Sequence, residues 1–269
     1  MSEYVLEVGR KGFDRLKFIN DVFGEYSRTY LLRAGLREGQ RILEVGCGTG
    51  SMTTWLAAQV GKHGRVIAVD ASEKQLEIAR KAAEESGISN VDFICSTIEA
   101  LDLPGDSIDL AYSRLLLMHL SDPKGALIDI KRFLKPDGMV ACEEPHASSL
   151  MTTPRNEHIE RLNELFVQLG KRQGLDFDIG DRLFSMMHSA GYSHLRACFV
   201  QPVISMADAI DFVLMGAAEI SPFAVKSGMV NRDEVERMLF DLQNSKYENE
   251  SYYTFPRQAQ IVGRKRQPG

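Results

Sequence analysis

The sequence contains few cysteines, and no two of them lie close together along the chain. The 269 residues include four, at Cys47, Cys95, Cys142 and Cys198, with no C-x-x-C pair. The sequence therefore predicts neither a zinc knuckle nor a framework of disulfide bonds. We expect buried thiols in a reducing compartment, and we expect no bound metal.

Long apolar runs are missing as well. No stretch approaches about 18 consecutive apolar residues, so the sequence predicts no transmembrane helix, and the first residues lack the basic and apolar regions of a signal peptide. A net charge of −5 gives no basic excess, which disfavours nucleic acid as a partner. With 44% apolar and 26% charged residues, the composition is that of an ordinary globular protein, which we expect to be cytoplasmic.

From residue 41 to residue 144 the sequence alternates between strand-like and helix-like segments. Helix starts are marked by Ser72 with Gln75, which form a capping box, and by Asp122 followed by Pro123. Such alternation favours an α/β fold, with a parallel sheet covered by helices on both faces. The predicted strands are Arg41–Val45, Arg65–Val69, Val91–Cys95, Ile108–Ser113 and Met139–Glu143.

A glycine-rich loop joins the first strand to the next helix. Gly46, Gly48 and Gly50 allow the backbone to turn sharply and a ligand to approach it closely. Glu44 lies just before this loop, and Asp70 ends the following strand. In dinucleotide-type folds an acidic residue in that place binds ribose hydroxyls, so the sequence predicts a nucleoside site.

The residues around the loop distinguish between possible nucleosides. Ser51 and Met52 follow Gly50, where a P-loop would have its phosphate-binding lysine. The spacing G-x-G-x-G also differs from the G-x-G-x-x-G of nicotinamide and flavin sites, and Glu44 would repel a pyrophosphate at the helix N-terminus. S-adenosylmethionine carries an amino-acid tail with a cationic amine and no phosphate, so it suits this loop.

Three motifs resemble the successive motifs of the class I S-adenosylmethionine-dependent methyltransferases, in their small-molecule branch. They are Glu44-Val-Gly-Cys-Gly-Thr-Gly50, Val69-Asp70-Ala71-Ser72 and Leu134-Lys-Pro-Asp-Gly138. The resemblance covers residues 36–144 well. It implies a Rossmann-like fold with a seven-stranded, mostly parallel sheet of order 3-2-1-4-5-7-6, in which the last strand is antiparallel.

The resemblance also implies roles for the glycine loop and the second strand. Glu44 and Gly46 would face the methionine tail of the cofactor, in a loop that also contains Cys47, Gly48 and Gly50. Asp70 and Ala71 would bind the ribose.

Two further segments take cofactor roles from the same resemblance. The family usually has a carboxylate for the adenine amine after the third strand, and this sequence has Thr97 there, followed by Ile98, which would pack against the ring. Ser113, Arg114 and Leu115, at the end of the fourth strand, would touch the sulfur end of the cofactor.

Three other candidates come from residue type and position. Tyr26, in a predicted lead-in helix over Gly12–Ala34, would place an aromatic ring over the sulfonium, and the alternative is a core aromatic. His119 and His146 are candidate catalytic bases. For His119 the alternative is a packing role, and for His146 it is an ordinary position in a surface loop.

Less regular segments flank and interrupt the predicted core. We expect a helical lead-in at 1–35, a methyltransferase core at 36–145, 179–204 and 253–269, and helical insertions at 146–178 and 205–252. The insertions would form a cap that selects the substrate, and a homodimer is possible.

The predicted function is methyl transfer from S-adenosylmethionine to an O, N or C atom of a small molecule by in-line displacement. One alternative is a methyltransferase for RNA or protein, although Ser113-Arg114-Leu115-Leu116 stands where nitrogen-methylating enzymes of this fold often have Asn/Asp-Pro-Pro-Tyr/Phe. The others are a non-catalytic cofactor-binding or regulatory protein and a nicotinamide oxidoreductase.

Overall fold

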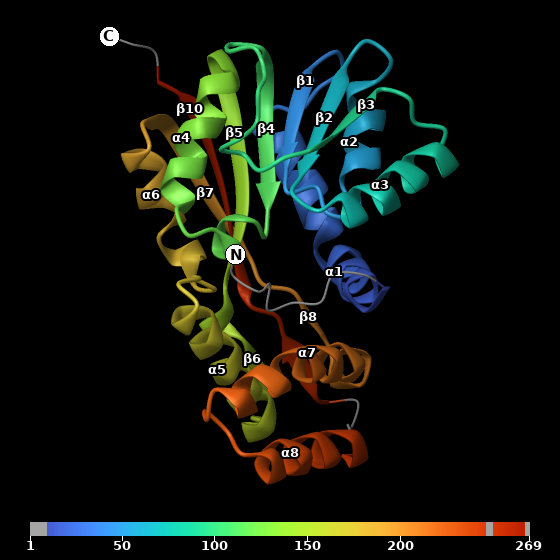
Figure 1. Cartoon of the computed structure of the whole chain (residues 1–269), viewed down its shortest axis with the longest axis vertical. Coiled ribbons are helices and arrows are strands. Elements are labelled where there is room, and N and C mark those ends of the chain that lie inside the picture. Colours follow the sequence, from blue (N-terminus) through green and yellow to red (C-terminus); the bar gives the residue numbers. More distant parts are fainter. Residues whose placement is uncertain (1–9, 246–249, 267–269) are drawn as a thin grey trace.

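The computed structural model describes residues 10–245 and 250–266, which form a seven-stranded sheet, a three-stranded sheet and the helices around them (Figure 1). The strands of the large sheet are β1 (Arg41–Val45), β2 (Arg65–Asp70), β3 (Val91–Cys95), β4 (Ile108–Arg114), β5 (Leu134–His146), β7 (Tyr192–Val200) and β10 (Arg257–Lys265). Their order is β3-β2-β1-β4-β5-β10-β7.

This order confirms the predicted fold. Along the chain, β7 is the sixth strand of this sheet and β10 is the seventh, so the order is 3-2-1-4-5-7-6. β1 to β5 pair in parallel, whereas β10 is antiparallel to both β5 and β7. The carboxyl ends of β1, β2 and β4 therefore meet at one edge, where open α/β sheets bind their ligands.

Both faces of the large sheet are covered, as the apolar strands require. In β1, Ile42 packs into the cluster under α1 (Arg10–Ala34), α2 (Thr53–Val60) and α3 (Glu73–Glu85). Its neighbour Leu43 packs into the opposite cluster, under α4 (Pro123–Phe133) and α6 (Leu183–Ser189).

The helix starts agree with the capping signals of the sequence. The Ser72 hydroxyl accepts a hydrogen bond from the Gln75 amide at the start of α3, and the Asp122 carboxylate accepts one from the Gly125 amide at the start of α4. Each bond satisfies a backbone donor that the first helical turn leaves free. Because the caps fix where α3 and α4 begin, they also fix the length of the loops that precede them.

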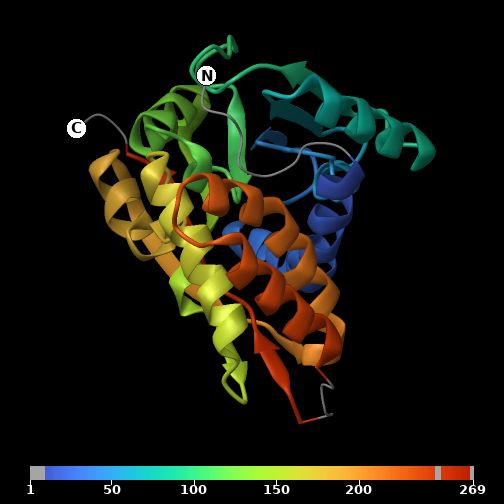
Figure 2. The same cartoon turned by 60° about the horizontal axis from the view of Figure 1, so that its bottom comes forward.

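A second region lies below the carboxyl edge of the large sheet (Figures 1 and 2). It contains α5 (Glu157–Arg172), α7 (Met206–Lys226), α8 (Arg232–Asn244) and a small antiparallel sheet. The small sheet has the order β6-β9-β8, from β6 (Met151–Thr153), β9 (Tyr252–Thr254) and β8 (Val203–Ser205). Phe23 of α1 belongs to the same apolar cluster, so α1 joins the two regions.

One predicted strand is divided in the structure. The sequence predicts a strand over Tyr192–Val203, but β7 ends at Val200 and β8 begins at Val203 in the other sheet. Pro202 lies between them, and its carbonyl accepts a hydrogen bond from the Phe255 amide. A proline has no amide hydrogen for a sheet ladder, which explains the break.

In the described ranges 10–245 and 250–266, no helix combines the length and the apolar character needed to cross a membrane.

Candidate functional site

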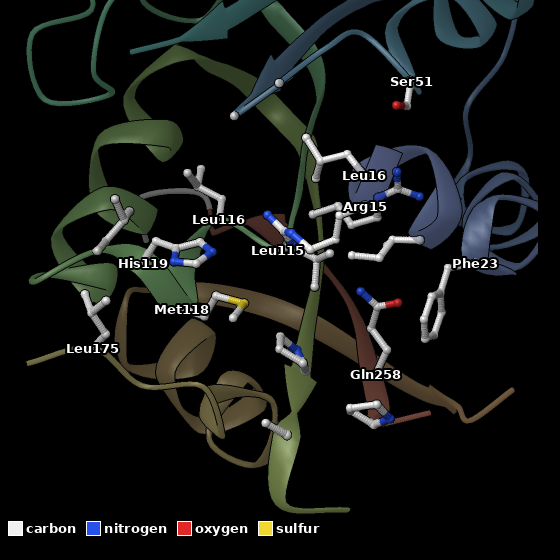
Figure 3. Close-up of a pocket in the computed structure, with 18 of the residues that line it drawn as sticks. Arg15, Leu16, Phe23, Ser51, Leu115, Leu116, Met118, His119, Leu175 and Gln258 are labelled. Atoms are coloured by element: carbon white, nitrogen blue, oxygen red, sulfur yellow. The ribbon is translucent and has the colours of Figure 1, made fainter. Parts of the chain in front are cut away.

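A cavity of about 850 Å³ lies between the carboxyl edge of the large sheet and the second region (Figure 3). Its residues fall into two groups. The "cofactor half", named for the role that the sequence predicts, consists of lining residues from β1, β2, β4, Leu115–Leu116 and the loops that follow β1, β2 and β3. The "acceptor half", named for the remaining space, consists of the other lining residues, from α1, the segment Met118–Ser121, the segment 145–150, α5 and the loop after it, α7 and the chain around β9 and β10.

The glycine loop lines the cofactor half through three of its predicted residues. Gly46, Cys47 and Gly48 are all at the cavity, and both glycines have positive φ angles, 73° and 55°. The amides of Gly46 and Cys47 donate to the carbonyl of Val69, at 2.8 and 3.0 Å. The loop is therefore fixed against β2 by its own backbone.

Gly50, the third predicted glycine, is not among the residues that line the cavity. A Cβ at Gly50 would lie 2.9 Å from the Cβ of Ala79, and the φ angle is +79°. The third glycine therefore allows α3 to pack closely against the loop. The sequence could not separate this packing role from a role in ligand binding.

Glu44 is buried at the bottom of the cofactor half, with 3% of its surface exposed. Its carboxylate accepts a 2.6 Å hydrogen bond from the Thr53 hydroxyl. Burial raises the pKa of Glu44 to about 7, against the opposing effects of this bond and of the Arg114 charge. A buried carboxylate of this kind suits a cationic ligand group, which would compensate for the water it has lost.

Asp70 lines the cofactor half beside Ala71, as predicted. Its carboxylate accepts hydrogen bonds from the amides of Gly48 and Ser72, both at 2.9 Å. Burial raises its pKa, while these two bonds lower it. A carboxylate has about four acceptor positions, so two remain for ligand hydroxyls.

The loop after β3 contributes both predicted residues and one that the sequence analysis missed. Thr97 and Ile98 line the cavity, and so does Glu99. Glu99 places a carboxylate in the segment from which one was expected, two positions after Thr97. The acidic residue was visible in the sequence, but the sequence analysis assigned the adenine contact to Thr97 because of its position after the strand.

The end of β4 provides two of its three predicted residues. Arg114 and Leu115 line the cavity, whereas Ser113 is buried beneath it, with 1% exposed. Leu115 has a φ of +54°, an unusual conformation for a branched side chain. Such strain occurs often at functional sites.

Glu144, which the sequence analysis missed, holds the loop after Leu115 in place. Its buried carboxylate accepts hydrogen bonds from the backbone amides of Leu116, Leu117 and Met118, at 3.0, 2.8 and 3.2 Å. Burial raises the pKa of Glu144 to about 7, and the three bonds oppose this rise. Glu144 thereby positions the short helix η1 (Leu117–His119) at the boundary of the two halves.

Arg114 also fastens α1 to the sheet. Its guanidinium donates to the Ser27 hydroxyl at 3.2 Å and to the Asn20 side-chain oxygen at 3.1 Å. Ser27 in turn donates to Glu143, which also accepts from Tyr112 at 2.6 Å. Arg114 therefore combines a cavity-lining position with a structural network.

Two predicted candidates lie outside the cavity. Tyr26 is 45% exposed and lines a separate hollow, because beyond Phe23 the helix α1 lies against β7 and β10 rather than over the cavity. His146 contacts Asp181, with 2.6 Å between Nδ1 and Oδ1, and Arg257 donates to the same pair. The sequence placed His146 correctly at the end of β5, but its side chain joins this ion-pair cluster.

His119 does line the cavity, at the boundary of the two halves. Its ring packs edge-on against Phe177, with 5.6 Å between the ring centres. Burial, together with the nearby charge of Arg15, lowers the pKa of His119 to about 4. The imidazole is therefore neutral and weakly basic at pH 7.

The acceptor half is mainly apolar, and the sequence analysis assigned none of its other residues to the site. Its polar exceptions include Arg15 on α1, Gln173 after α5 and Gln258 on β10. Each of these three has a buried side-chain atom with no hydrogen-bond partner among the described residues, namely Nε, Oε1 and Oε1, and the Nε of Arg15 forms an ion pair with Glu219 at 3.4 Å. The larger apolar residues are Leu16, Ile19, Phe23, Met118, Leu120, Leu150, Ile159, Leu162, Phe166, Leu175, Phe212, Val213, Ile220, Tyr253 and Phe255.

Comparisons with known proteins agree with this geometry. Residues 36–187 match the sequence model of a family described as "methyltransferase domain". An uncharacterised methyltransferase of Schizosaccharomyces pombe is 34% identical over half of this chain and half of its own length. A ubiquinone biosynthesis O-methyltransferase of Roseobacter denitrificans is 29% identical over 66% of this chain and 69% of its own.

Among solved structures, the YcgJ protein of Bacillus subtilis has the same fold. It is 20% identical, with a TM-score of 0.61, and the alignment covers 93% of this chain and all of that one. The chain spans only 50% and 59% of the length of the first two curated relatives that it matches.

Proposed function

The chain belongs to the methyltransferase-domain family, and we propose on this basis that it transfers a methyl group from S-adenosylmethionine to a small molecule. The match covers more than half of the chain and includes all the predicted motifs. The family match and the order of the large sheet bear out the resemblance to the class I methyltransferases. The acceptor atom would be oxygen, nitrogen or carbon.

The observation that carries this proposal is the environment of Glu44. A buried carboxylate, with its pKa raised to about 7, lies beside a glycine loop that opens into the cavity. A phosphate would be repelled there, whereas the amine of an amino-acid tail would restore the lost solvation of the carboxylate. Glu44 would therefore hold the tail, and Asp70 the ribose.

The adenine would lie along the loop after β3. Ile98 is buried at the cavity and offers an apolar surface to the ring. Thr97 and Glu99 provide the oxygen atoms near it that would accept from the adenine amine.

When bound, S-adenosylmethionine supplies an activated methyl group on a sulfonium. What remains for the chain is to orient the acceptor and to exclude water. Holding the nucleophile about 3–3.5 Å from the methyl carbon can supply roughly 7–11 kcal/mol of the barrier reduction. Arg114, Leu115 and the segment that follows would position the reacting ends.

The lead-in at 1–35 and the insertions at 146–178 and 205–252 would form the substrate cap. Support comes from α1, α5 and α7, each of which contributes residues to the acceptor half. One relative is named a ubiquinone biosynthesis O-methyltransferase, and this name supports a small molecule as the methyl acceptor. The apolar lining argues against an RNA acceptor, whose phosphates would need basic side chains.

The cellular setting is also a proposal. All four cysteines are free thiols, which supports a reducing compartment such as the cytoplasm. The homodimer stays a prediction.

Calorimetry with S-adenosylmethionine, S-adenosylhomocysteine and NAD(H) tests the cofactor assignment. We expect both sulfur compounds to bind and the nicotinamide to show no heat. Binding of NAD(H) alone would make the protein an oxidoreductase. Tight binding of S-adenosylmethionine without methyl transfer to any acceptor of a broad panel would favour the non-catalytic alternative.

A further inference from the structure

The acceptor half contains an amide oxygen that the protein leaves unpaired. Gln258, on β10, is 2% exposed, and the buried Oε1 of its side chain has no hydrogen-bond partner among the described residues. Figure 3 shows the side chain of Gln258 reaching from β10 into the cavity. Buried polar atoms are almost always paired, and Oε1 can only accept, so the missing partner is a hydrogen-bond donor.

The strand β10 itself offers a comparison. Two positions after Gln258, the side chain of Gln260 is equally buried and donates to Glu143 at 2.7 Å. That bond holds the Gln260 amide in place, whereas the Gln258 amide can turn about its last bond, which has a broad torsional profile. The oxygen of Gln258 can therefore meet a donor that enters the cavity.

The charge of the acceptor half is balanced inside the protein. Arg15 is the charged side chain among its described lining residues, and its Nε lies 3.4 Å from a carboxylate oxygen of Glu219 on α7. The two side chains are 14% and 5% exposed. A charged ligand could gain a counter-charge only by displacing one member of this pair, which would then lie buried without that counter-charge.

The two other ionisable side chains among the described lining residues of this half carry no charge at pH 7. Burial and the nearby charge of Arg15 lower the pKa of His119 to about 4, so its imidazole stays neutral. Burial raises the pKa of Tyr253, so its hydroxyl keeps its proton. A ligand that is itself neutral suits this half, because an ion would lose its hydration and find no free counter-charge.

We propose that the methyl acceptor is a neutral, largely apolar molecule with a hydroxyl group, which donates a hydrogen bond to Oε1 of Gln258. This inference rests on the proposed methyl transfer and specifies its substrate class. A hydroxyl is a donor that stays uncharged, whereas at pH 7 an aliphatic amine is an ammonium ion and a carboxylic acid has lost its proton. The hydrogen bond orients the molecule in an otherwise apolar space, so Gln258 determines specificity.

The test uses four probes with one naphthalene ring, namely 2-naphthalenemethanol, its methyl ether, 2-naphthoate and 2-naphthylmethylamine. The alcohol and the ether are both neutral and differ in the hydrogen-bond donor. The acid is an anion at pH 7, and the amine is a cation. Equilibrium dialysis against the full chain saturated with S-adenosylhomocysteine measures each dissociation constant with the cofactor half filled.

Three variants are compared with wild-type protein. Gln258→Leu removes the acceptor oxygen, and its matched control is Gln59→Leu, which changes an exposed glutamine on α2 outside the cavity. Glu219→Gln tests the charge balance, because it removes the carboxylate and leaves Arg15 charged. Melting curves show which variants are folded.

We expect wild type and Gln59→Leu to bind the alcohol several-fold more tightly than the ether, and about tenfold or more tightly than either ion. In Gln258→Leu the alcohol and the ether should bind equally well. In Glu219→Gln the affinity for 2-naphthoate should rise about tenfold, because Arg15 then lacks its counter-charge.

Three results in wild type and Gln258→Leu would overturn the inference: the alcohol does not bind, the ether or an ion binds as tightly as the alcohol, or the preference for the alcohol over the ether survives in Gln258→Leu. An unchanged affinity of folded Glu219→Gln for 2-naphthoate would refute the charge balance from which the neutral acceptor is inferred. Wild-type protein that fails to bind S-adenosylhomocysteine would instead refute the proposed function. Cofactor binding without a preference for the alcohol would refute only the acceptor class.

Discussion

The two halves of the cavity differ in how their residues are distributed along the chain. In the cofactor half, Glu44, Gly46, Gly48 and Asp70 come from two adjacent parallel strands and one loop, and backbone hydrogen bonds fix their places. In the acceptor half, Arg15 and Gln258 are 243 positions apart, and both line the cavity only because the fold brings α1 and β10 to it. A local motif therefore builds one half, and tertiary packing builds the other.

Their charges differ as well. The cofactor half presents the carboxylates of Glu44, Asp70 and Glu99, with Arg114 beside them, whereas the acceptor half presents Arg15. The first set suits a cofactor with a cationic tail. In the acceptor half, by contrast, the charge of Arg15 is paired with the buried carboxylate of Glu219 at 3.4 Å. The following experiments test whether the halves are as separate as this comparison says.

The largest effect is expected for Asp70→Ala. Loss of its carboxylate should raise the dissociation constant of S-adenosylhomocysteine by roughly 10- to 100-fold, because a hydrogen bond to a charged group contributes about 1.5–3 kcal/mol. Isothermal titration calorimetry measures the change. Asp102→Ala, an exposed aspartate outside the cavity, is the matched control, and equal affinities for the two variants would reject the ribose assignment.

The glycine loop allows the comparison to be made within one motif. Gly50→Ala should lower the free energy of unfolding by about 1–3 kcal/mol, because its new methyl group would overlap Ala79. In Gly48→Ala the new methyl group would meet no atom within 4 Å, so only the positive φ of this position should lower the free energy of unfolding. The same methyl group lies at the cavity and should weaken cofactor binding. Denaturant melts and calorimetry on both variants separate the effects, and the reverse pattern would contradict the roles assigned here.

The pH dependence of cofactor binding tests Glu44. Its pKa of about 7 in the free protein means that it is mostly protonated below pH 7, whereas the cofactor amine binds the carboxylate. Affinity for S-adenosylhomocysteine should therefore rise with pH by up to tenfold per unit between about pH 5 and 7 and then level off. In Glu44→Gln this rise should be lost, and a profile as steep as the wild type's would assign the titration to another group.

The smallest effect is expected for His146→Ala. His146 lies outside the cavity in an exposed cluster with Asp181 and Arg257, and such pairs contribute about 0–1 kcal/mol. Once an acceptor is known, turnover should stay within about twofold of wild type. A loss of a hundredfold or more would return His146 to the role of catalytic base.

Much of the fold could be predicted because its signals are local. The capping residues Ser72 and Asp122 begin helices where expected, and the strand alternation yields the sheet order that the resemblance implied. Thr97 and Ile98 likewise reach the cavity as expected. The helix starts depend on residues a few positions apart, and the cavity positions of Thr97 and Ile98 depend on a single edge of the sheet.

The features that the sequence analysis did not anticipate have a common cause, since each concerns the direction of one side chain or packing between distant elements. Tyr26 is on the predicted helix, but only the part of this helix up to Phe23 lines the cavity, and Tyr26 lines a separate hollow. Gly50 has the expected positive φ, but its missing side chain makes room for Ala79. Glu144 follows a predicted strand, yet its task of holding three amides is visible only in three dimensions.

The sequence by itself determined the α/β sheet, the glycine loop and the acidic residues that bracket it, because hydrophobic periodicity and loop chemistry act over short distances. Only the tertiary structure decided which side chains share the acceptor half. Arg15, His119 and Gln258 all line it because the fold brings α1, η1 and β10 around one cavity, and no local pattern in the sequence records that arrangement.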